Sequence, residues 1–141
     1  MPTLAFGRIG NCLMLVHPEI PPSDQDWDKY LEFLDQQRSD KVRLVVSTRG
    51  GGPSAAQRGR LRDVVNRYPT KILPTAILTA SVVARGVMTA ISWFIPGLEA
   101  FAPNQLGAAL NYLGIPVALE GEVSRAIQGL HKKTSDEAAR T

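Results

Sequence analysis

The chain opens with two short apolar runs, residues 4–9 and 12–17, which a Gly-Asn pair joins. Such a pair is typical of a tight hairpin turn, so the pattern predicts two antiparallel strands. After a proline-rich linker, Ser23 and the acidic residues behind it predict the start of a helix, because a serine cap and early carboxylates are favourable there. Apolar residues at helical spacing then predict a helix that ends near Arg38.

Beyond this point, apolar runs with strand character alternate with apolar stripes at helical spacing. The remaining predicted strands are 42–46, 72–78 and 98–101, and the remaining predicted helices begin at Ser54, Ser81, Pro103 and Glu120. Alternating strands and helices imply a largely parallel sheet, to which the opening hairpin adds an antiparallel edge. We therefore expect one α/β domain over residues 1–133, with about five strands and four to five helices, and a flexible polar tail over 134–141.

The composition fits this expectation, since 44% hydrophobic and 21% charged residues in a chain of 141 are those of an ordinary globular domain. Cys12, the single cysteine, lies in an apolar run and is expected to be a buried strand residue, which excludes an internal disulfide framework. The first residues lack the pattern of a secretory signal, which favours a cytoplasmic protein. The apolar stretch 74–95 contains Arg85 and a Thr-Ala-Ser break, so we expect a strand followed by a helix rather than a membrane span.

The charge pattern adds one feature, a group of five arginines around one loop and the helix after it. They are Arg49, Arg58, Arg60, Arg62 and Arg67. Such a cluster can attract nucleic acid, an acidic protein surface or phosphate. The net charge of only +3, with no aromatic residues among the arginines, disfavours nucleic acid as the partner.

The order of elements over about residues 4–115 resembles the STAS domain of SpoIIAA-like anti-sigma factor antagonists. The sharpest part of the resemblance is the segment 45–56, in which a strand, a small-residue loop and a helix-opening serine follow one another. In that family the equivalent junction carries a regulatory serine, often after aspartate, which a partner kinase phosphorylates. The resemblance implies a non-enzymatic regulatory module that binds a protein partner such as a serine kinase. Ser54 is the position that looks equivalent, although Pro53 stands where the family often has aspartate.

Phosphorylation of Ser54, or of the nearby Thr48, would place negative charge at a helix start, close to Arg49 and Arg58. The alternative for Ser54 is a role as helix cap alone. A different function class stays open for the glycines of the loop, Gly50, Gly51 and Gly52, because their amides could hold a phosphate or nucleotide together with Arg49 and Arg85. The spacing of a P-loop or a dinucleotide fingerprint is absent.

No pattern of catalytic residues accompanies these features. His17 and His131 lie far apart without acids or thiols at metal-ligand spacing, and His17 is expected to end a strand. Ser54 and Cys12 have no evident base. We therefore expect no enzyme activity, no metal and no cofactor.

The expected docking surface combines the junction 48–58 with the exposed side of the helix predicted over 81–94. Its candidate binding residues for a partner or anion are Thr48, Arg49, Gly50, Gly51, Gly52, Ser54, Arg58, Arg85 and Trp93. Tryptophan is enriched among binding hot spots, which is the reason for including Trp93. The sequence leaves self-association into a homodimer open.

Overall fold

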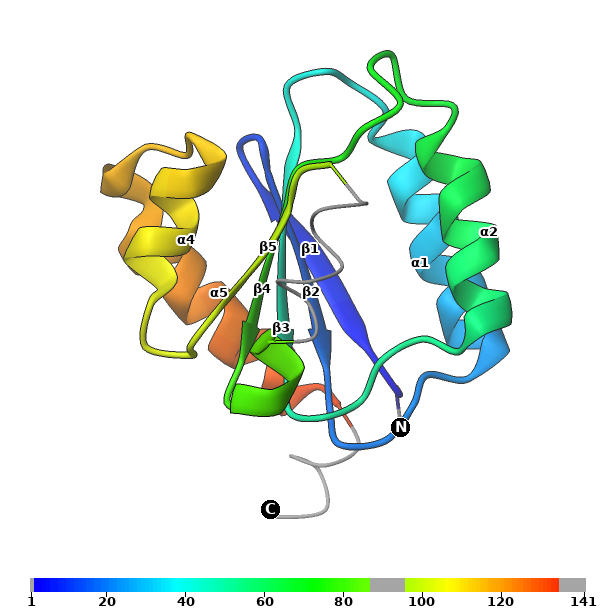
Figure 1. Ribbon diagram of the computed structural model, residues 1–141, viewed down its shortest axis with the longest axis horizontal. Helices are drawn as coiled ribbons and strands as arrows, with labels where there is room; N and C mark the ends of the chain where they lie inside the picture. Colours follow the sequence, from blue (N-terminus) through cyan, green and yellow to red (C-terminus); the bar gives the residue numbers. More distant parts are fainter. Residues whose placement is uncertain (1, 87–95, 135–141) are drawn as a thin grey trace.

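A computed structural model of the chain describes residues 2–86 and 96–134, and within these ranges a five-stranded sheet forms the centre of the molecule (Figure 1). The strands follow one another across the sheet in the order of the sequence. They are β1 (Ala5–Ile9), β2 (Cys12–His17), β3 (Arg43–Thr48), β4 (Thr75–Thr79) and β5 (Leu98–Phe101). β1 is antiparallel to β2, and β2 to β5 are parallel. The predicted fold class, a mostly parallel sheet with an antiparallel edge hairpin, is confirmed.

The register aligns the last residues of three parallel strands. His17 lies beside Thr48, and Thr48 lies beside Thr79. The loops that follow β2, β3 and β4 therefore leave the sheet at one edge, which we call the carboxyl edge. In open sheets of parallel strands this is the side on which loops most often carry function.

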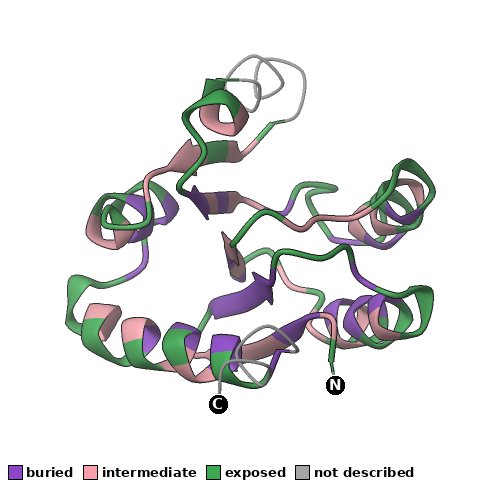
Figure 2. Ribbon diagram, turned by 90° about the horizontal axis from the view of Figure 1, so that it is seen from below, coloured by how far each residue is buried: buried purple, intermediate pink, exposed green. Residues whose placement is uncertain are grey.

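Helices cover both faces of the sheet (Figures 1 and 2). The described helices are α1 (Asp24–Gln36), α2 (Ala55–Val65), α4 (Leu106–Leu113), the short 3-10 helix η1 (Val117–Leu119) and α5 (Glu120–Lys132). A further helical turn at 82–86 follows β4. α1 and α2 pack on one face, and α4 and α5 pack on the other (Figure 1). Figure 2 shows that the helices turn their buried residues toward the sheet.

The alternation of side chains along β2 supplies both halves of the core. Met14 and Val16 belong to the cluster beneath α4 and α5, while Leu13 and Leu15 belong to the cluster beneath α1 and α2. Because both faces of a central parallel strand are buried, β2 reads as a continuous apolar run. Cys12 is fully buried as expected, and burial raises the pKa of its thiol to about 11.

Two strand boundaries differ from the prediction by more than one residue. β3 extends through the polar pair Ser47 and Thr48, because the ladder with β2 continues as far as Thr48. β4 begins only at Thr75, after Pro74. Pro74 has no N–H to donate, so the ladder starts behind it.

Three further predictions concern the polar tail from Thr134, the apolar stretch 74–95 and the helix expected over 81–94. Thr134, the first residue of the predicted tail, is fully buried, and its hydroxyl donates to the carbonyl of His131 at 2.7 Å. Within residues 2–86 and 96–134, no helix is long and apolar enough to cross a membrane. Residues 87–95, which include Trp93 and most of the helix predicted over 81–94, lie outside the described residues.

Candidate functional site

The loop after β3 packs backbone to backbone against the loop after β2. The amide of Arg49 donates to the carbonyl of His17 at 3.0 Å, and the amide of Gly51 donates to the carbonyl of Pro18 at 2.8 Å. A Cβ atom on Gly51 would lie 2.6 Å from the Pro18 carbonyl oxygen and closer still to that of Ile20. Only glycine fits at this position, so Gly51 is the residue of the loop that this close approach requires.

Thr48 organises the same loop from within. Its hydroxyl donates to the carbonyl of Gly51 at 2.6 Å and accepts from the amide of Gly50 at 3.0 Å. Gly50 has a φ of 128°, a conformation that L side chains rarely adopt. Thr48 is half-buried, and its hydroxyl is already engaged in two contacts of the loop.

Ser54 is exposed at the start of α2, where it caps the helix and forms a capping box with Gln57. The Ser54 hydroxyl accepts from the Gln57 amide at 3.2 Å, and the Gln57 side chain accepts from the Ser54 amide at 2.9 Å. Gln57 itself is buried, and it also donates to the carbonyl of Pro22 at 3.1 Å and to Asp24 at 2.9 Å. The carbonyl of Gln57 accepts from the Trp27 indole at 2.9 Å. The start of α2 is thereby fixed against the start of α1, and the Ser54 hydroxyl faces solvent from a rigid position.

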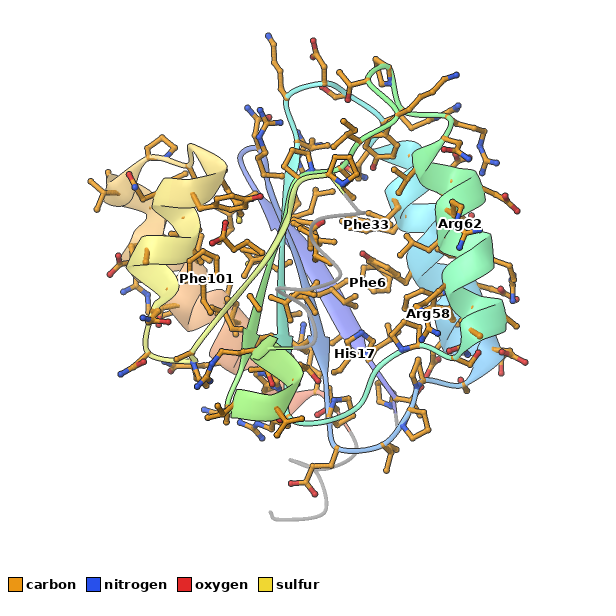
Figure 3. The ribbon with its side chains drawn as sticks, in the orientation of Figure 1. Phe6, His17, Phe33, Arg58, Arg62 and Phe101 are labelled. Carbon is orange, nitrogen blue, oxygen red and sulfur yellow. The ribbon has the colours of Figure 1, made fainter. Side chains whose placement is uncertain are left out.

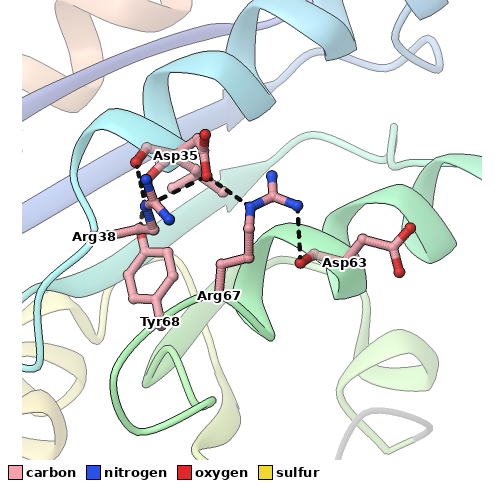
Figure 4. Close-up of polar contacts among 6 residues, drawn as sticks. Asp35, Arg38, Asp63, Arg67 and Tyr68 are labelled. Atoms are coloured by element: carbon pink, nitrogen blue, oxygen red, sulfur yellow. Dashed lines mark hydrogen bonds and ion pairs between the residues drawn. The ribbon is translucent and has the colours of Figure 1, made fainter.

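Some arginines of the cluster form ion pairs with α1, and others are exposed without an ion pair to a described residue. Arg60 forms an ion pair with Asp28 of α1, and Arg67 contacts Asp35 at 3.1 Å (Figure 4). All four side chains are about half exposed, so these pairs contribute little to stability. These two ion pairs nevertheless engage two of the five arginines with carboxylates of α1.

Arg58 and Arg62 lie one turn apart on α2 (Figure 3). Both are exposed, and neither forms an ion pair with another described residue. Arg58 donates to the carbonyl of Pro53 at 3.0 Å, which holds its guanidinium beside the first turn of α2. Ser54 and Arg58 are four residues apart and therefore share one side of the helix.

The turn after β4 completes the carboxyl edge. Ser81 caps the helical turn as predicted, with its hydroxyl accepting from the amide of Ala84 at 3.0 Å. Arg85 folds back and donates to the carbonyl of Thr79 at 2.7 Å. Val82 and Val83 are strongly exposed, at 71% and 78% of their surface. Val82 and Val83 therefore form an exposed apolar surface in the first part of this turn.

A pair of buried histidines at the same edge escaped the sequence analysis as a group. Ser47 of β3 and His131 of α5 are 84 residues apart, yet the Ser47 hydroxyl lies 2.8 Å from Nε2 of His131. His17 (Figure 3) is 2% exposed, and its ring stacks on that of Trp27 at a centroid distance of 6.2 Å. Burial and, to a smaller extent, the charge of nearby His131 lower the pKa of His17 to about 4. No local motif could reveal this group, because three separate elements contribute it.

The histidines and the carboxylates do not form a metal centre within the described parts of the chain. No group of three histidine, cysteine, aspartate or glutamate side chains there has the geometry to hold an ion.

The backbone amides of the glycine loop already have hydrogen-bond acceptors. The amides of Gly50, Gly51 and Ser54 each donate to an acceptor of the chain itself. An anion could bind those three amides only after the loop had opened.

Comparison with known proteins gives a match for the fold alone. No family model matches the chain, and no curated protein matches it. Among solved structures, the chain is similar to an uncharacterized protein of the DUF3478 family with a SpoIIAA-like fold from Shewanella loihica PV-4. The two are 14% identical with a TM-score of 0.58, over 80% of this chain and 95% of that chain. This likeness shows that the chain has a SpoIIAA-like fold, as its order of elements predicted.

Proposed function

We propose that this chain is a non-enzymatic regulatory module that binds a protein partner through the carboxyl edge of its sheet. One observation carries the proposal: the loops that leave this edge carry three exposed apolar side chains, and the helix after one of these loops begins at an exposed capping serine. Ile20 is 41% exposed and packs its backbone against Gly51, while Val82 and Val83 follow β4. Apolar side chains rimmed by polar residues are typical of protein interaction surfaces. We call Ile20, Ser54, Arg58, Val82 and Val83 the docking surface.

The second part of the proposal is that phosphorylation of Ser54 regulates this surface, with a cytoplasmic serine kinase among the partners. The Ser54 hydroxyl is exposed at a helix start, with Arg58 one turn further along α2. A phosphate there would add about −1.5 to −2 charges, favoured by the helix start and by the guanidinium. Because Ser54 lies on the surface, the added charge would change the affinity for a partner without unfolding the domain. The SpoIIAA-like fold supports this proposal, since Ser54 stands at the strand-loop-helix junction that looks equivalent to the one carrying the regulatory serine in SpoIIAA-like antagonists.

The Ser47 and His131 contact does not change the class of function that we propose. Ser47 is half-buried and His131 is 5% exposed. A nucleophilic serine must reach a substrate, and Ser47 lines neither the groove beside Leu4 nor the groove beside Gly10. We assign this pair to holding α5 against the end of β3.

Photo-crosslinking in native cells tests the docking surface. A photoreactive amino acid is placed at Val83 in one variant and at Val117 in another, because the two valines are 78% and 79% exposed. Val117 lies in η1, next to residues that line a groove at the opposite edge of the sheet. We expect a discrete protein crosslink from position 83 and none from position 117. Equal crosslinking from both positions, or none from position 83, would contradict the proposal.

Mass analysis tests the proposed switch separately. The chain purified from native cells is expected to carry one phosphate, which fragmentation assigns to Ser54. A Ser54→Ala chain from the same cells should lack it. A chain that stays unmodified under several growth conditions would leave Ser54 as a helix cap only, while the docking surface would still stand on the crosslinking result.

A further inference from the structure

β1 is the first strand of the sheet, and its outer side pairs with no other strand of residues 2–86 and 96–134. In an antiparallel pair, alternate residues direct their N–H and C=O groups away from the neighbouring strand. β1 therefore presents unpaired backbone groups along an edge that can accept a further strand.

A groove of about 270 Å³ runs along the start of this edge, between α1 and α5. Leu4, Phe6 and Leu130 supply its apolar wall, and Lys29 and Lys133 stand on its two sides. The half-buried ring of Phe6 lies 4.8 Å from that of Phe33 on α1, so aromatic surface continues beside the strand (Figure 3). The edge thus combines strand pairing with apolar contact.

The charges around the groove are mixed rather than uniformly basic. Asp26 lines the groove together with Lys29 and Lys133, and it accepts two hydrogen bonds from Thr3 at 2.6 and 2.8 Å. These bonds lower the pKa of Asp26, so the carboxylate stays ionised. The carboxylate of Asp26 would repel a purely acidic segment, so the groove favours an occupant that carries both positive and negative charges.

The helices beside the edge carry such a pattern along their length. α5 begins with Glu120 and Glu122 and ends with His131 and Lys132, and Lys133 follows directly. α1 likewise has acidic residues in its first turn, and Arg38 follows its end. A two-fold axis beside the outer side of β1, perpendicular to the sheet, would make each helix antiparallel to the same helix of the second copy. The acidic start of one helix would then face the basic end of the other. A two-fold interface requires this kind of self-complementarity.

We propose that β1 pairs in antiparallel orientation with β1 of a second copy of this chain, which joins the two sheets into one. In this dimer, Lys133 of each copy lies opposite Glu122 of the other. β4 is three strands away from β1, so Val82 and Val83 of both copies stay accessible. The proposal stands on the edge strand and its flanking charges and does not depend on the switch at Ser54.

Sedimentation velocity over a range of micromolar concentrations, with charge variants, tests the dimer. Glu122 and Lys133 are exposed, so their reversal leaves the fold intact. We expect Lys133→Glu to weaken the dimer roughly tenfold, because it places like charges at two symmetric positions. The double variant Glu122→Lys with Lys133→Glu should restore dimerisation, since the swapped charges again face each other. Lys41→Glu, an equal change of charge at an exposed lysine of the opposite groove, should have no effect.

Hydrogen exchange locates the contact. The amides of residues 4–9 should gain protection as the concentration rises, while the amides of the other edge strand, β5, should not. A chain that is monomeric at every concentration would overturn the proposal. A dimer that is indifferent to Lys133→Glu, or protection of β1 that appears only when an acidic peptide such as poly-glutamate is added, would overturn it equally.

Discussion

Replacing Gly51 by alanine should damage the candidate site through a single methyl group. The new Cβ would lie within 2.6 Å of the Pro18 carbonyl oxygen, so the two loops must separate. Inserting a methyl into a tightly packed place costs roughly 1–3 kcal/mol, and losing the hydrogen bond from Gly51 to Pro18 costs about 1 kcal/mol more. The restricted unfolded chain returns about 0.5–1 kcal/mol. We therefore expect a net loss of about 1–3.5 kcal/mol in the free energy of unfolding.

Gly52→Ala is the matched control, because a Cβ on Gly52 meets no atom within 4 Å. Urea unfolding followed by circular dichroism measures both variants. The expected loss for Gly51→Ala lowers the midpoint by roughly 1–2 M urea, whereas Gly52→Ala should stay close to the unmodified chain. If the two variants had the same midpoint, the packing of this loop against Pro18 and Ile20 would be wrong.

Three further expectations concern single groups. The folded-state pKa of His17 is lowered to about 4, so between pH 6.5 and 4 only the unfolded chain binds a proton at this histidine. The free energy of unfolding should therefore decrease as the pH is lowered from 6.5 to 4, by up to about 3 kcal/mol. Urea titrations should show a smaller fall for His17→Leu, and equal pH dependence would refute this. Tyr68→Phe removes the 2.8 Å hydrogen bond from the Tyr68 hydroxyl to the carbonyl of Leu34, which still accepts from the Gln37 amide, and should cost about 1 kcal/mol in the same assay. Ser54→Ala should cost about 1 kcal/mol as a lost cap, and Ser54→Asp, which can still accept from the Gln57 amide, should cost less; the reverse order would refute the capping box.

The fold was largely predictable because its local signals agree with its tertiary structure. The Gly-Asn turn, the capping serines and Gly114 mark the ends of elements by their own backbone chemistry, and Gly114 ends α4 in the left-handed conformation that glycine adopts readily. The helix predicted from Pro103 begins three residues later, at Leu106. The end of β3 was missed for a different reason, since Ser47 and Thr48 become strand only through pairing with β2.

The candidate site was only partly predictable. Ser54 and its capping box follow from residues three positions apart, and the structure places them as the spacing indicates. The clash that requires Gly51, and the contact between Ser47 and His131, join segments that are distant in sequence. Such contacts have no local pattern, so only the packed fold reveals them.

One measurement tests the central claim most directly: the yield of crosslinked partner from a photoreactive residue at Val83, compared in native cells between chains with Ser54, Ser54→Ala and Ser54→Glu. If the carboxyl edge is a docking surface that phosphorylation of Ser54 regulates, the Ala and Glu backgrounds should differ several-fold in yield at equal protein levels. Position 117 should give no crosslink in any background. A yield at position 83 that does not change among the three backgrounds, or that does not exceed the yield at position 117, would contradict the account.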